Sequence, residues 1–398
     1  MSKLDELLRE LCPNGVEYKT LGEIAVDIYR GAGITRDQVT AEGTPCVRYG
    51  EIYTTYGVWF DKCVSHTDES KLLSKKYFEH GDILFAITGE SVDDIAKCCV
   101  YIGHEKCLAG GDIVVLKHNQ NPKYLSYALA TTDARQQKSK GKVKSKVVHS
   151  SVPAIREIKV PVPPIEIQRE IVRILDNFTN LTAELTAELT ARGIQYSYYR
   201  NKLLTFHSDT KIVQLADIAD IGTGSSNTNE AVEDGKYPFF VRSQEPLRKN
   251  DYEYDETAII TAGDGVGVGK VYHYIEGKYA LHQRAYRIHI NTPEVMPKYY
   301  FHYMKAKFLP YIQKTMFQGS VASIRRPMLN AFPVPVPPLD VQNRIVNVLD
   351  NFEKICSDLN IGLPAEIEAR QKQYEYYRDK LLTFAENGNT ILSRAEQS

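Results

Sequence analysis

The chain has 398 residues, of which 43% are hydrophobic and 25% charged. This composition is typical of a folded protein with more than one core and excludes a disordered one. The formal net charge is −1, so a nucleic-acid-binding surface would need local clusters of Lys and Arg. Residues 1–11 lack the apolar core of a signal peptide, and no uninterrupted apolar run approaches about 18 residues, so we expect a cytoplasmic protein that does not span a membrane. The seven cysteines form no Cys-x-x-Cys pair, which favours reduced thiols over a zinc site.

The first part of the chain, residues 1–157, has the pattern of a mixed α/β domain. Short apolar runs at Asp82–Thr88 and Asp112–Lys117 are typical of strands. The stretch Tyr124–Thr131 has a helical pattern. We therefore predict one domain that combines strands and helices.

Residues 158–206 are predicted to form one long helix. Apolar and aromatic residues recur at a seven-residue spacing over about five heptads, which indicates a long packed helix. Pro163 and Pro164 precede it, where proline is tolerated. A helix from Glu166 to Phe206 would be about 60 Å long at about 1.5 Å per residue. The stripe includes Ile171, Phe178, Leu185, Tyr199 and Phe206.

Residues 207–331 predict a second mixed α/β domain, with strands at Ala258–Ala262 and Ala285–Ile290 and a helix at Tyr299–Lys307. Residues 332–398 carry a second apolar stripe typical of a long helix. In this copy Gly362–Pro364 should kink or break the helix.

A glycine-rich segment at Gly263–Lys270 invites comparison with nucleotide-binding loops. Val271 stands where a P-loop needs Ser or Thr. A strand follows the segment, whereas a dinucleotide-binding fingerprint is followed by a helix. The segment therefore predicts a glycine-rich hairpin.

The strongest feature of the sequence is an internal repeat. Pro161–Phe178 and Pro335–Phe352 are identical at 11 of 18 positions, and Gln195–Phe206 and Gln373–Phe384 at 10 of 12. The regions upstream match only weakly. The predicted fold class is α+β: two dissimilar mixed α/β domains separated by two long antiparallel helices, related by a pseudo-two-fold internal repeat. The weak upstream echoes are Leu21–Ala25 with Leu215–Ala219, and Pro122–Tyr124 with Pro297–Tyr299.

The chain contains, twice, a Pro-x-Pro-Pro segment, an acidic-x-Gln-x-x-Ile-Val segment and a long helix, each time after a dissimilar domain. In this combination it resembles the specificity subunits of type I restriction-modification systems over essentially its whole length. The tandem Thr-Ala-Glu-Leu units at Thr182–Leu185 and Thr186–Leu189 are similar to those of the family branch in which their copy number sets the spacing of the recognition site.

The resemblance implies a non-catalytic, DNA-binding subunit. Residues 1–157 and 207–331 would be target-recognition domains, each reading one half of a bipartite site in double-stranded DNA. Residues 158–206 and 332–398 would be the central and C-terminal conserved regions, which dock two modification subunits. Those subunits would carry S-adenosylmethionine and methylate adenine N6, and two restriction subunits would use ATP and Mg. The chain itself would hold no cofactor and no metal.

The physical reading of the repeat agrees with a spacer role. Four added helical residues lengthen a helix by about 6 Å, which is close to two base-pair rises of about 3.4 Å each. Two readers on a rigid rod could address half-sites about one helical turn apart. The expected spacer residues are Thr182, Leu185, Thr186 and Leu189.

DNA contacts need Lys and Arg for phosphates and Arg, Asn, Gln, Ser or Thr for base edges. Alternating lysines around Gly141 and the basic, hydroxyl-rich segment Gln318–Arg326 are the expected phosphate contacts. Arg48 and Arg242 form a pair, because each follows a strand that starts with proline. In the first domain the candidates are Arg30, Arg36, Arg48, Tyr49, Glu51, Thr88, Lys138, Lys140, Lys142 and Lys144. In the second they are Ser225, Asn227, Arg242, Gln244, Arg284, Gln318, Arg325 and Arg326.

Two other functions stay open from the sequence. A stand-alone sequence-specific regulator would use the same domains without enzyme partners. A nucleotide-dependent enzyme built on the glycine-rich segment would lose nucleotide binding on Lys270→Ala.

Overall fold

The structure is a computed structural model that describes residues 2–92, 94–139, 142–144, 147–315 and 323–384. The chain forms two compact units. Unit 1 consists of residues 1–184 and 367–398, and unit 2 consists of residues 185–366. Within the described part of the chain, no helix combines the length and apolar character needed to cross a membrane.

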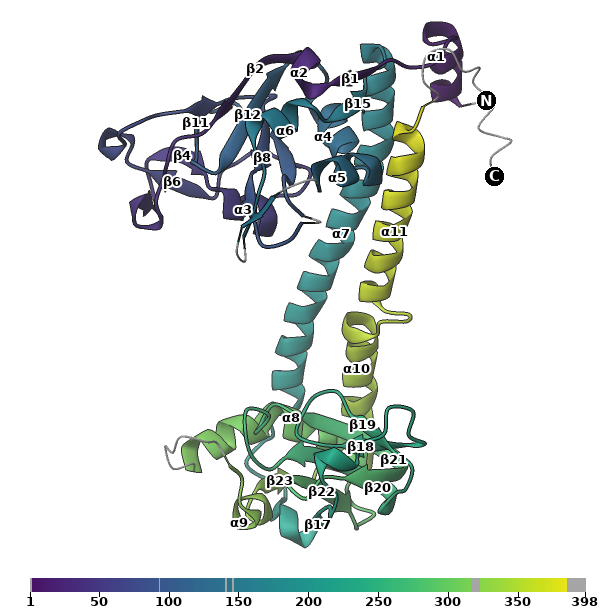
Figure 1. Cartoon of the computed structure of the whole chain (residues 1–398). Helices are drawn as coiled ribbons and strands as arrows, with labels where there is room; N and C mark the ends of the chain where they lie inside the picture. Colours follow the sequence, from purple (N-terminus) through teal and green to yellow (C-terminus); the bar gives the residue numbers. More distant parts are fainter. Residues whose placement is uncertain (1, 93, 140–141, 145–146, 316–322, 385–398) are drawn as a thin grey trace. The chain divides into compact units, whose positions relative to one another are not determined.

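Unit 1 contains two five-stranded sheets (Figure 1), one in the order β2-β12-β8-β10-β5 and the other in the order β3-β6-β4-β11-β7. Their central strands are fully buried, which explains why they read as continuous apolar runs. The first sheet consists of β2 (Ala25–Arg30), β5 (Trp59–Phe60), β8 (Ile83–Ala86), β10 (Cys98–Tyr101) and β12 (Ile113–His118). The second consists of β3 (Val39–Thr40), β4 (Thr44–Val47), β6 (Ser65–Thr67), β7 (Tyr77–Phe78) and β11 (Cys107–Ala109).

Helices and short strands complete unit 1. A small sheet in the order β13-β14-β9 lies beside the end of β8. Its strands are β9 (Thr88–Gly89), β13 (Lys142–Lys144) and β14 (Val147–His149). The helices are α1 (Lys3–Leu11), α2 (Leu21–Ile24), α3 (Tyr49–Thr54), α4 (Pro122–Leu129), α5 (Thr132–Lys138) and α6 (Val152–Arg156).

Unit 2 has a six-stranded sheet in the order β17-β22-β20-β21-β18-β19. The predicted strand at residues 258–262 is confirmed as the second half of β20, and the one at residues 285–290 is confirmed as β22. The strands are β17 (Ala219–Thr223), β18 (Tyr237–Phe240), β19 (Leu247–Lys249), β20 (Tyr254–Ala262), β21 (Tyr272–Leu281) and β22 (Ala285–Ile290). The helices between β22 and the second long helical region are α8 (Pro297–Thr315) and α9 (Arg326–Asn330).

The two sheets share a topology that the sequence repeat did not reveal. The order β2-β12-β8-β10 of unit 1 matches the order β17-β22-β20-β21 of unit 2. The register agrees as well, because Ile113 faces Ala86 in unit 1 and Ala285 faces Ala262 in unit 2. In unit 2 the long β21 pairs with both β20 and β18. In unit 1 two strands share these pairings, because β10 pairs with β8 and β11 pairs with β4. The two mixed α/β domains, residues 1–157 and 207–331, are called the variable domains below; they have one framework despite their dissimilar sequences.

Each variable domain is joined to the rest of the chain by a two-stranded ribbon. In unit 1, β1 (Tyr18–Thr20) pairs antiparallel with β15 (Lys159–Pro161). In unit 2, β16 (Ile212–Gln214) pairs in the same way with β23 (Pro333–Pro335). The entry and exit strands of each domain are thus neighbours.

The repeated motifs hold this junction together through a buried glutamine. The Gln168 carboxamide accepts from the Asn121 backbone N–H and donates to the Pro163 carbonyl, at 2.9 and 2.8 Å. The Gln342 carboxamide accepts from Met296 and donates to Pro337, both at 2.8 Å. The Gln of the motif therefore ties the start of each long helix to the proline-rich segment and to the loop before α4 or α8.

The Pro-Lys-Tyr motif makes a second, equivalent tie. The Tyr124 hydroxyl donates to the Pro161 carbonyl at 3.0 Å, and the Tyr299 hydroxyl to the Pro335 carbonyl at 2.9 Å. Both tyrosines are fully buried. The weak sequence echo upstream of the repeat thus marks a conserved contact rather than a chance match.

The long helix is confirmed as α7 (Ile165–Leu203), which has 39 residues. Its counterpart is broken as predicted: α10 (Leu339–Ser357) ends before Gly362, and α11 (Leu363–Leu382) begins there, with Pro364 in its first turn. Unit 1 contains the start of α7 and most of α11, whereas unit 2 contains the end of α7 and all of α10.

The repeat is visible in the aromatic contacts between these helices. In unit 1 the rings of Phe178 and Tyr377 stack with centroids 5.5 Å apart. In unit 2 the rings of Phe352 and Tyr199 stack at 5.7 Å. Phe178 and Phe352 occupy the same repeat position, as do Tyr377 and Tyr199. Within each unit one helix begins and the other ends, so the internal repeat is pseudo-two-fold, with antiparallel helices.

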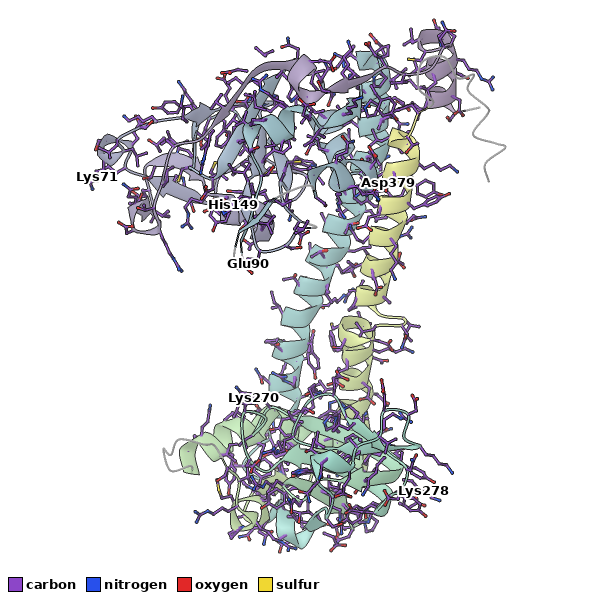
Figure 2. The ribbon with its side chains drawn as sticks, in the orientation of Figure 1. Lys71, Glu90, His149, Lys270, Lys278 and Asp379 are labelled. Carbon is purple, nitrogen blue, oxygen red and sulfur yellow. The ribbon has the colours of Figure 1, made fainter. Side chains whose placement is uncertain are left out.

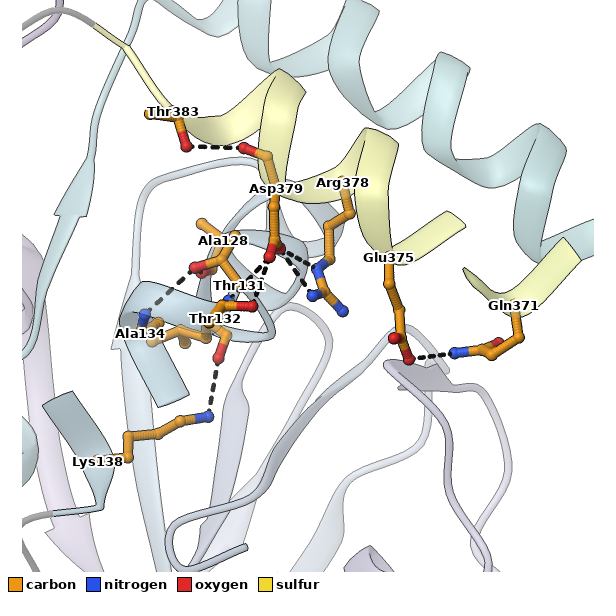
Figure 3. Close-up of polar contacts among 11 residues, drawn as sticks. Ala128, Thr131, Thr132, Ala134, Lys138, Gln371, Glu375, Arg378, Asp379 and Thr383 are labelled. Atoms are coloured by element: carbon orange, nitrogen blue, oxygen red, sulfur yellow. Dashed lines mark hydrogen bonds and ion pairs between the residues drawn. The ribbon is translucent and has the colours of Figure 1, made fainter. Parts of the chain in front are cut away.

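In unit 1, α11 also contacts the variable domain through Asp379 (Figure 3). Its carboxylate accepts from the backbone N–H of Thr132 and from its hydroxyl, in the first turn of α5. The other carboxylate oxygen accepts two bonds from the buried Arg378 guanidinium, at 2.8 and 2.7 Å. A carboxylate at a helix N-terminus is stabilised by the helix dipole, so this contact anchors α11 to α5.

The glycine-rich segment is confirmed as a hairpin turn. It connects β20 to β21, which pair antiparallel. Gly265 and Gly269 have φ angles of 80° and 68°, which side chains rarely adopt. Glycine is needed here for the tight turn, and the strand that follows rules out a nucleotide fingerprint.

Candidate nucleic-acid interface

Backbone hydrogen bonds define which loop residues of the two units correspond. The Gly110 N–H donates to the Val47 carbonyl at 2.9 Å in unit 1, and the His282 N–H donates to the Phe240 carbonyl at 2.9 Å in unit 2. One strand over, Ile87 donates to Asp112 as Gly263 donates to Arg284, at 3.0 and 2.9 Å. It follows that Thr88 corresponds to Asp264, Asp112 to Arg284, and Arg48 to Val241.

In unit 2 these loops bring together two predicted arginines and an unforeseen carboxylate. Arg242 follows β18, Asp264 follows β20, and Arg284 precedes β22. One oxygen of Asp264 lies 2.7 Å from the Arg242 guanidinium and the other lies 3.2 Å from that of Arg284. The side chains of the two arginines are 42% and 62% exposed, against 22% for Asp264. Three separate loops thus form one charged cluster at the surface.

The electrostatics keep Asp264 ionised. Burial raises the pKa of the Asp264 carboxyl, but the hydrogen bonds and charges of Arg242 and Arg284 outweigh this and lower it below its usual range. Burial lowers the pKa of the neighbouring His282, whose Nδ1 accepts from the Arg284 N–H at 2.9 Å. Two cations and one anion leave a surplus positive charge on this surface.

The cluster borders a shallow depression with a volume of 420 Å³. Asn227, a third predicted residue, lines it and accepts a hydrogen bond from the Gln283 side chain. Ser225 lies on the same loop and donates its N–H to Glu253, whereas Gln244 is exposed in the turn after Arg242. The depression therefore combines guanidinium and carboxamide groups. Its lining residues are Asn227, Thr228, Asn229, Arg242, His282, Gln283 and Arg284.

In unit 1 the corresponding loops carry a different set of side chains. Arg30, which is exposed, forms an ion pair at 2.6 Å with the half-buried Asp112. The Thr88 hydroxyl lies 3.3 Å from Nδ1 of His149, and the neighbouring Glu90 and His149 mark this edge in Figure 2. Arg36 is exposed in the segment after β2.

Two predicted residues of unit 1 are placed differently from the expectation. Glu51 is buried and accepts hydrogen bonds from the Ser65 hydroxyl at 2.6 Å and the Arg48 N–H at 3.0 Å, so it caps α3 rather than facing solvent. Arg48 lies over this carboxylate at 3.5 Å and is half-buried. The expected pairing with Arg242 is wrong by one residue, because Arg48 corresponds to Val241. Tyr49, at the start of α3, is exposed.

The lysine-rich segment also needs correction at one position. Lys138 ends α5 and is buried, with its ammonium group donating to the Leu129 carbonyl at 2.8 Å. Burial lowers the pKa of Lys138, and a group enclosed in this way cannot reach phosphates. Lys140 lies outside the described residues. Lys142 and Lys144 are in β13, which β14 connects to Thr88 and Gly89.

The second basic segment lies beside Asp264. Ser323 forms a β-bridge with Asp264, and the Ile324 N–H donates to the Gly263 carbonyl at 2.8 Å. Arg325 is exposed at the start of α9, whereas Arg326 donates to the Ile221 carbonyl. Gln318 lies outside the described residues. In unit 2 the end of the predicted basic segment therefore pairs directly with the residues after β20, whereas in unit 1 β14 lies between β13 and the residues that follow β8.

Comparison with known proteins identifies the family. The model of the type I restriction modification DNA specificity domain matches this chain twice, over residues 13–192 and 207–369. The chain belongs to this family. The specificity subunit of a type I restriction enzyme from Escherichia coli is 36% identical over 260 residues, which cover 57% of this chain and 63% of that protein. The chain therefore spans less than two thirds of the length of this relative.

Further similarities agree with the family. A Haemophilus influenzae protein described as a type I restriction enzyme specificity subunit is 31% identical over 271 residues, covering 62% of this chain and 68% of that protein. The S subunit of a type I restriction-modification system from M. genitalium matches with a TM-score of 0.58 at 15% identity, covering 94% of this chain and 97% of that one. At this identity the structural likeness concerns the fold.

The tandem Thr-Ala-Glu-Leu repeat of this specificity-domain protein lies within α7. The boundary between the two units falls inside it, between Glu184 and Leu185. Leu185 and Leu189 are half-buried and Thr186 is exposed. The Thr182 hydroxyl donates to the Phe178 carbonyl at 3.0 Å.

One polar cluster was missed by sequence reasoning because its members come from two helices. In unit 2, potential metal-binding atoms of His302, Asp350 and Glu353 lie within 4.8 Å of one another. His302 Nε2 lies 2.7 Å from Asp350, and the Lys305 ammonium lies 2.7 Å from Glu353. Because Lys305 already neutralises Glu353, the cluster is an ion-pair network between α8 and α10. Unit 1 has the matching contact, since the hydroxyl of Tyr127 donates to Asp176 at 2.7 Å.

Proposed function

We propose that this chain is the DNA sequence-specificity subunit of a type I restriction-modification complex, in which each variable domain reads one half of a bipartite site. The observation that carries the proposal is the pair of equivalent loop clusters. Backbone bonds hold the loops in the same way in both units, while the side chains at Asp112 and Arg284 differ in charge. A shared frame with different exposed polar groups is what two readers of different sequences need.

The long helix is proposed to set the distance between the half-sites. Helix α7 runs through both compact units without a break, and a helix transmits a change of length at about 1.5 Å per residue. The Thr-Ala-Glu-Leu repeat would then be the unit by which the spacer changes.

The helices are also proposed to dock the partners. Large apolar side chains are exposed on the helical part of unit 2, including Ile194 in α7 and Leu359 and Ile361 between α10 and α11. Exposed apolar groups of this kind favour a protein interface. The partners would be two modification subunits, which bind S-adenosylmethionine and methylate adenine N6, with restriction subunits supplying the ATP- and Mg-dependent steps.

The proposal is tested by sequencing the methylome of cells that express this chain together with type I modification subunits. We expect an adenine-methylated bipartite motif that disappears when this chain is deleted. Exchange of residues 207–331 for those of a relative should change one half-site only. A methyltransferase that keeps its motif without this chain would contradict the proposal.

The spacer is tested separately by a third Thr-Ala-Glu-Leu copy inserted after Leu189. We expect an unspecified spacer longer by about two base pairs, with both half-sites unchanged. A matched insertion of four residues after Asn250, in an exposed turn of unit 2, should leave the spacer unchanged. An altered half-site in the repeat insertion would contradict the ruler role.

A further inference from the structure

The charged cluster of unit 2 has the construction of a base reader. Each guanidinium contributes one nitrogen, Nη1, to the contact with Asp264, and each carboxylate oxygen receives one arginine. Within the described part of the chain, these are the hydrogen bonds that the side chains of Arg242 and Arg284 make. Both guanidinium groups keep an exposed edge with donors.

The carboxylate argues against a phosphate as the partner of these arginines. Asp264 is ionised and lies between the two guanidinium groups, so a phosphate approaching either one would meet a negative charge. A neutral base edge meets no such repulsion. A carboxylate that fixes one edge of an arginine also limits its rotamers, which reduces the entropy lost on binding.

The identity of the base follows from the donors. An arginine offers two parallel N–H groups, and these match the O6 and N7 acceptors that guanine presents in the major groove. Adenine offers one acceptor and one donor on that edge and suits a carboxamide instead. The side chains of Arg242 and Arg284 are 42% and 62% exposed, so their guanidinium groups are accessible to a base edge.

We propose that Arg242 and Arg284, positioned by Asp264, read guanine on its major-groove edge, so that the half-site recognised by unit 2 contains guanine. This inference rests on the proposed function and deepens it, because it names the base and the residues that select it. Unit 1 has Thr88 and Asp112 at the positions of Asp264 and Arg284, so its half-site is read by other groups.

The test uses the assembled methyltransferase complex and a DNA library randomised in both half-sites. The half-site of unit 2 is the one that changes when residues 207–331 are exchanged. We expect guanine in this half-site of the wild-type motif. Arg242→Lys or Arg284→Lys, which keep the charge but lose the paired donors, should reduce the preference for guanine at one position by about ten- to hundredfold.

Two further variants show whether Asp264 only positions the arginines and whether the arginines contact bases or phosphates. Asp264→Asn should lower the preference for guanine less than the arginine variants do and should increase methylation of non-cognate sites, because it removes a negative charge. Arg344→Lys, an exposed arginine of α10, is the matched control and should leave the motif unchanged. The half-site of unit 1, unaltered in every variant, reports that the complex is assembled.

Three outcomes would overturn the inference. A unit 2 half-site without guanine would do so, and the proposed function would stand. An equal loss of methylation on all sequences in Arg242→Lys and Arg284→Lys would assign these residues to phosphates, again leaving the proposed function intact. A wild-type complex with no motif at all would contradict both.

Discussion

In unit 1 the loop before β12 ends in Asp112, which forms an ion pair with Arg30. In unit 2 the equivalent loop, before β22, ends in Arg284, which forms an ion pair with Asp264. The hydrogen bonds that shape the two loops use backbone N–H and carbonyl groups, so they do not depend on these side chains. A framework fixed by backbone atoms leaves the exposed positions open to charge reversal. The following predictions test how equivalent the two units are elsewhere.

The largest effect is expected at the buried glutamines. Gln342→Ala removes three hydrogen bonds and leaves the backbone groups of Met296, Glu294 and Pro337 without a partner. We expect a loss of about 3 kcal/mol in the free energy of unfolding, because each buried unsatisfied group costs about 1–3 kcal/mol. Urea unfolding followed by circular dichroism measures it.

Gln168→Ala should cost less than Gln342→Ala. One of the three partners of Gln168 is the side chain of Gln120 rather than a backbone carbonyl, and that side chain can turn to water. The exposed neighbours provide controls: Arg169→Ala and Asn343→Ala should change the free energy of unfolding by less than about 0.5 kcal/mol. Equal losses at the two glutamines would show that the two junctions are energetically identical.

Acid should destabilise unit 1 through His118. Burial lowers the pKa of His118 to about 4, whereas the unfolded chain titrates near 6.5. Between these values the unfolded state binds more protons, so stability is lost as the pH falls from above 6.5 towards 4. At pH 5 the loss should be about 2 kcal/mol. The equivalent residue in unit 2 is Ile290, which does not titrate.

Hydrogen exchange at pH 7.5 and pH 5.0 measures this difference for each unit in the intact chain. His118→Asn keeps a side-chain acceptor for the Gln120 N–H and should reduce the acid sensitivity of unit 1. If the variant and the wild type lost equal protection on acidification, His118 would not be the responsible group.

The anchor at Asp379 should cost about 2 kcal/mol when it is removed, since two charge-assisted contacts are lost. Asp379→Asn deprives the first turn of α5 and the buried Arg378 of their carboxylate. Unit 2 has Asn201 at this repeat position, and there α8 continues through the region that is divided between α4 and α5 in unit 1. With no second helix N-terminus to cap, unit 2 has no need of the charge.

The reverse substitution, Asn201→Asp in unit 2, tests whether the two helix ends are interchangeable. Arg200 of unit 2 has a buried Nε with no hydrogen-bond partner within the described part of the chain. Asn201→Asp would offer it one, as Asp379 does for Arg378, and should raise the melting temperature slightly. A loss of stability in Asn201→Asp would show that the two helix ends are not interchangeable.

The smallest effect is expected at Lys138. Lys138→Met keeps the length of the side chain and removes a buried ammonium group, so DNA affinity of the assembled complex should not change. Arg325→Met, which removes an exposed charge from the second basic segment, should weaken binding to all sequences and reduce the salt dependence by about one unit of slope. DNA titrations at several salt concentrations give the slope of log affinity against log salt concentration for each variant. A reduced slope for Lys138→Met would show that Lys138 contacts DNA phosphates.

These residues show what the sequence could and could not predict. The apolar runs, the helix break at Gly362 and the glycine-rich hairpin were predictable because they depend on local preferences of the backbone. The burial of Lys138 was not predictable. The alternating lysines around Gly141 do not indicate that Lys138 ends α5 and that its side chain points into the core. Asp264 was not among the predicted residues, because its role depends on two arginines that lie 22 and 20 positions away in the sequence.

The pairing of Arg48 with Arg242 failed for a related reason. Arg48 comes directly after β4, which ends at Val47. Arg242 is the second residue after β18, which ends at Phe240, so the two arginines differ by one position relative to their strands. Successive residues of an extended chain point in opposite directions, so a shift of one residue exchanges a half-buried arginine for an exposed one. Such registers are fixed by pairing with a distant strand.

The ribbons β1–β15 and β16–β23 have a consequence for how these chains can change over generations. Each brings the first and last strands of a variable domain side by side through main-chain bonds, with β1 and β16 differing in sequence. A recombination event with its crossovers at both strands of a ribbon would exchange an entire domain and retain Gln168 or Gln342, which follows the last strand of the ribbon. If the proposed function holds, a new half-site could thus be acquired in a single genetic step.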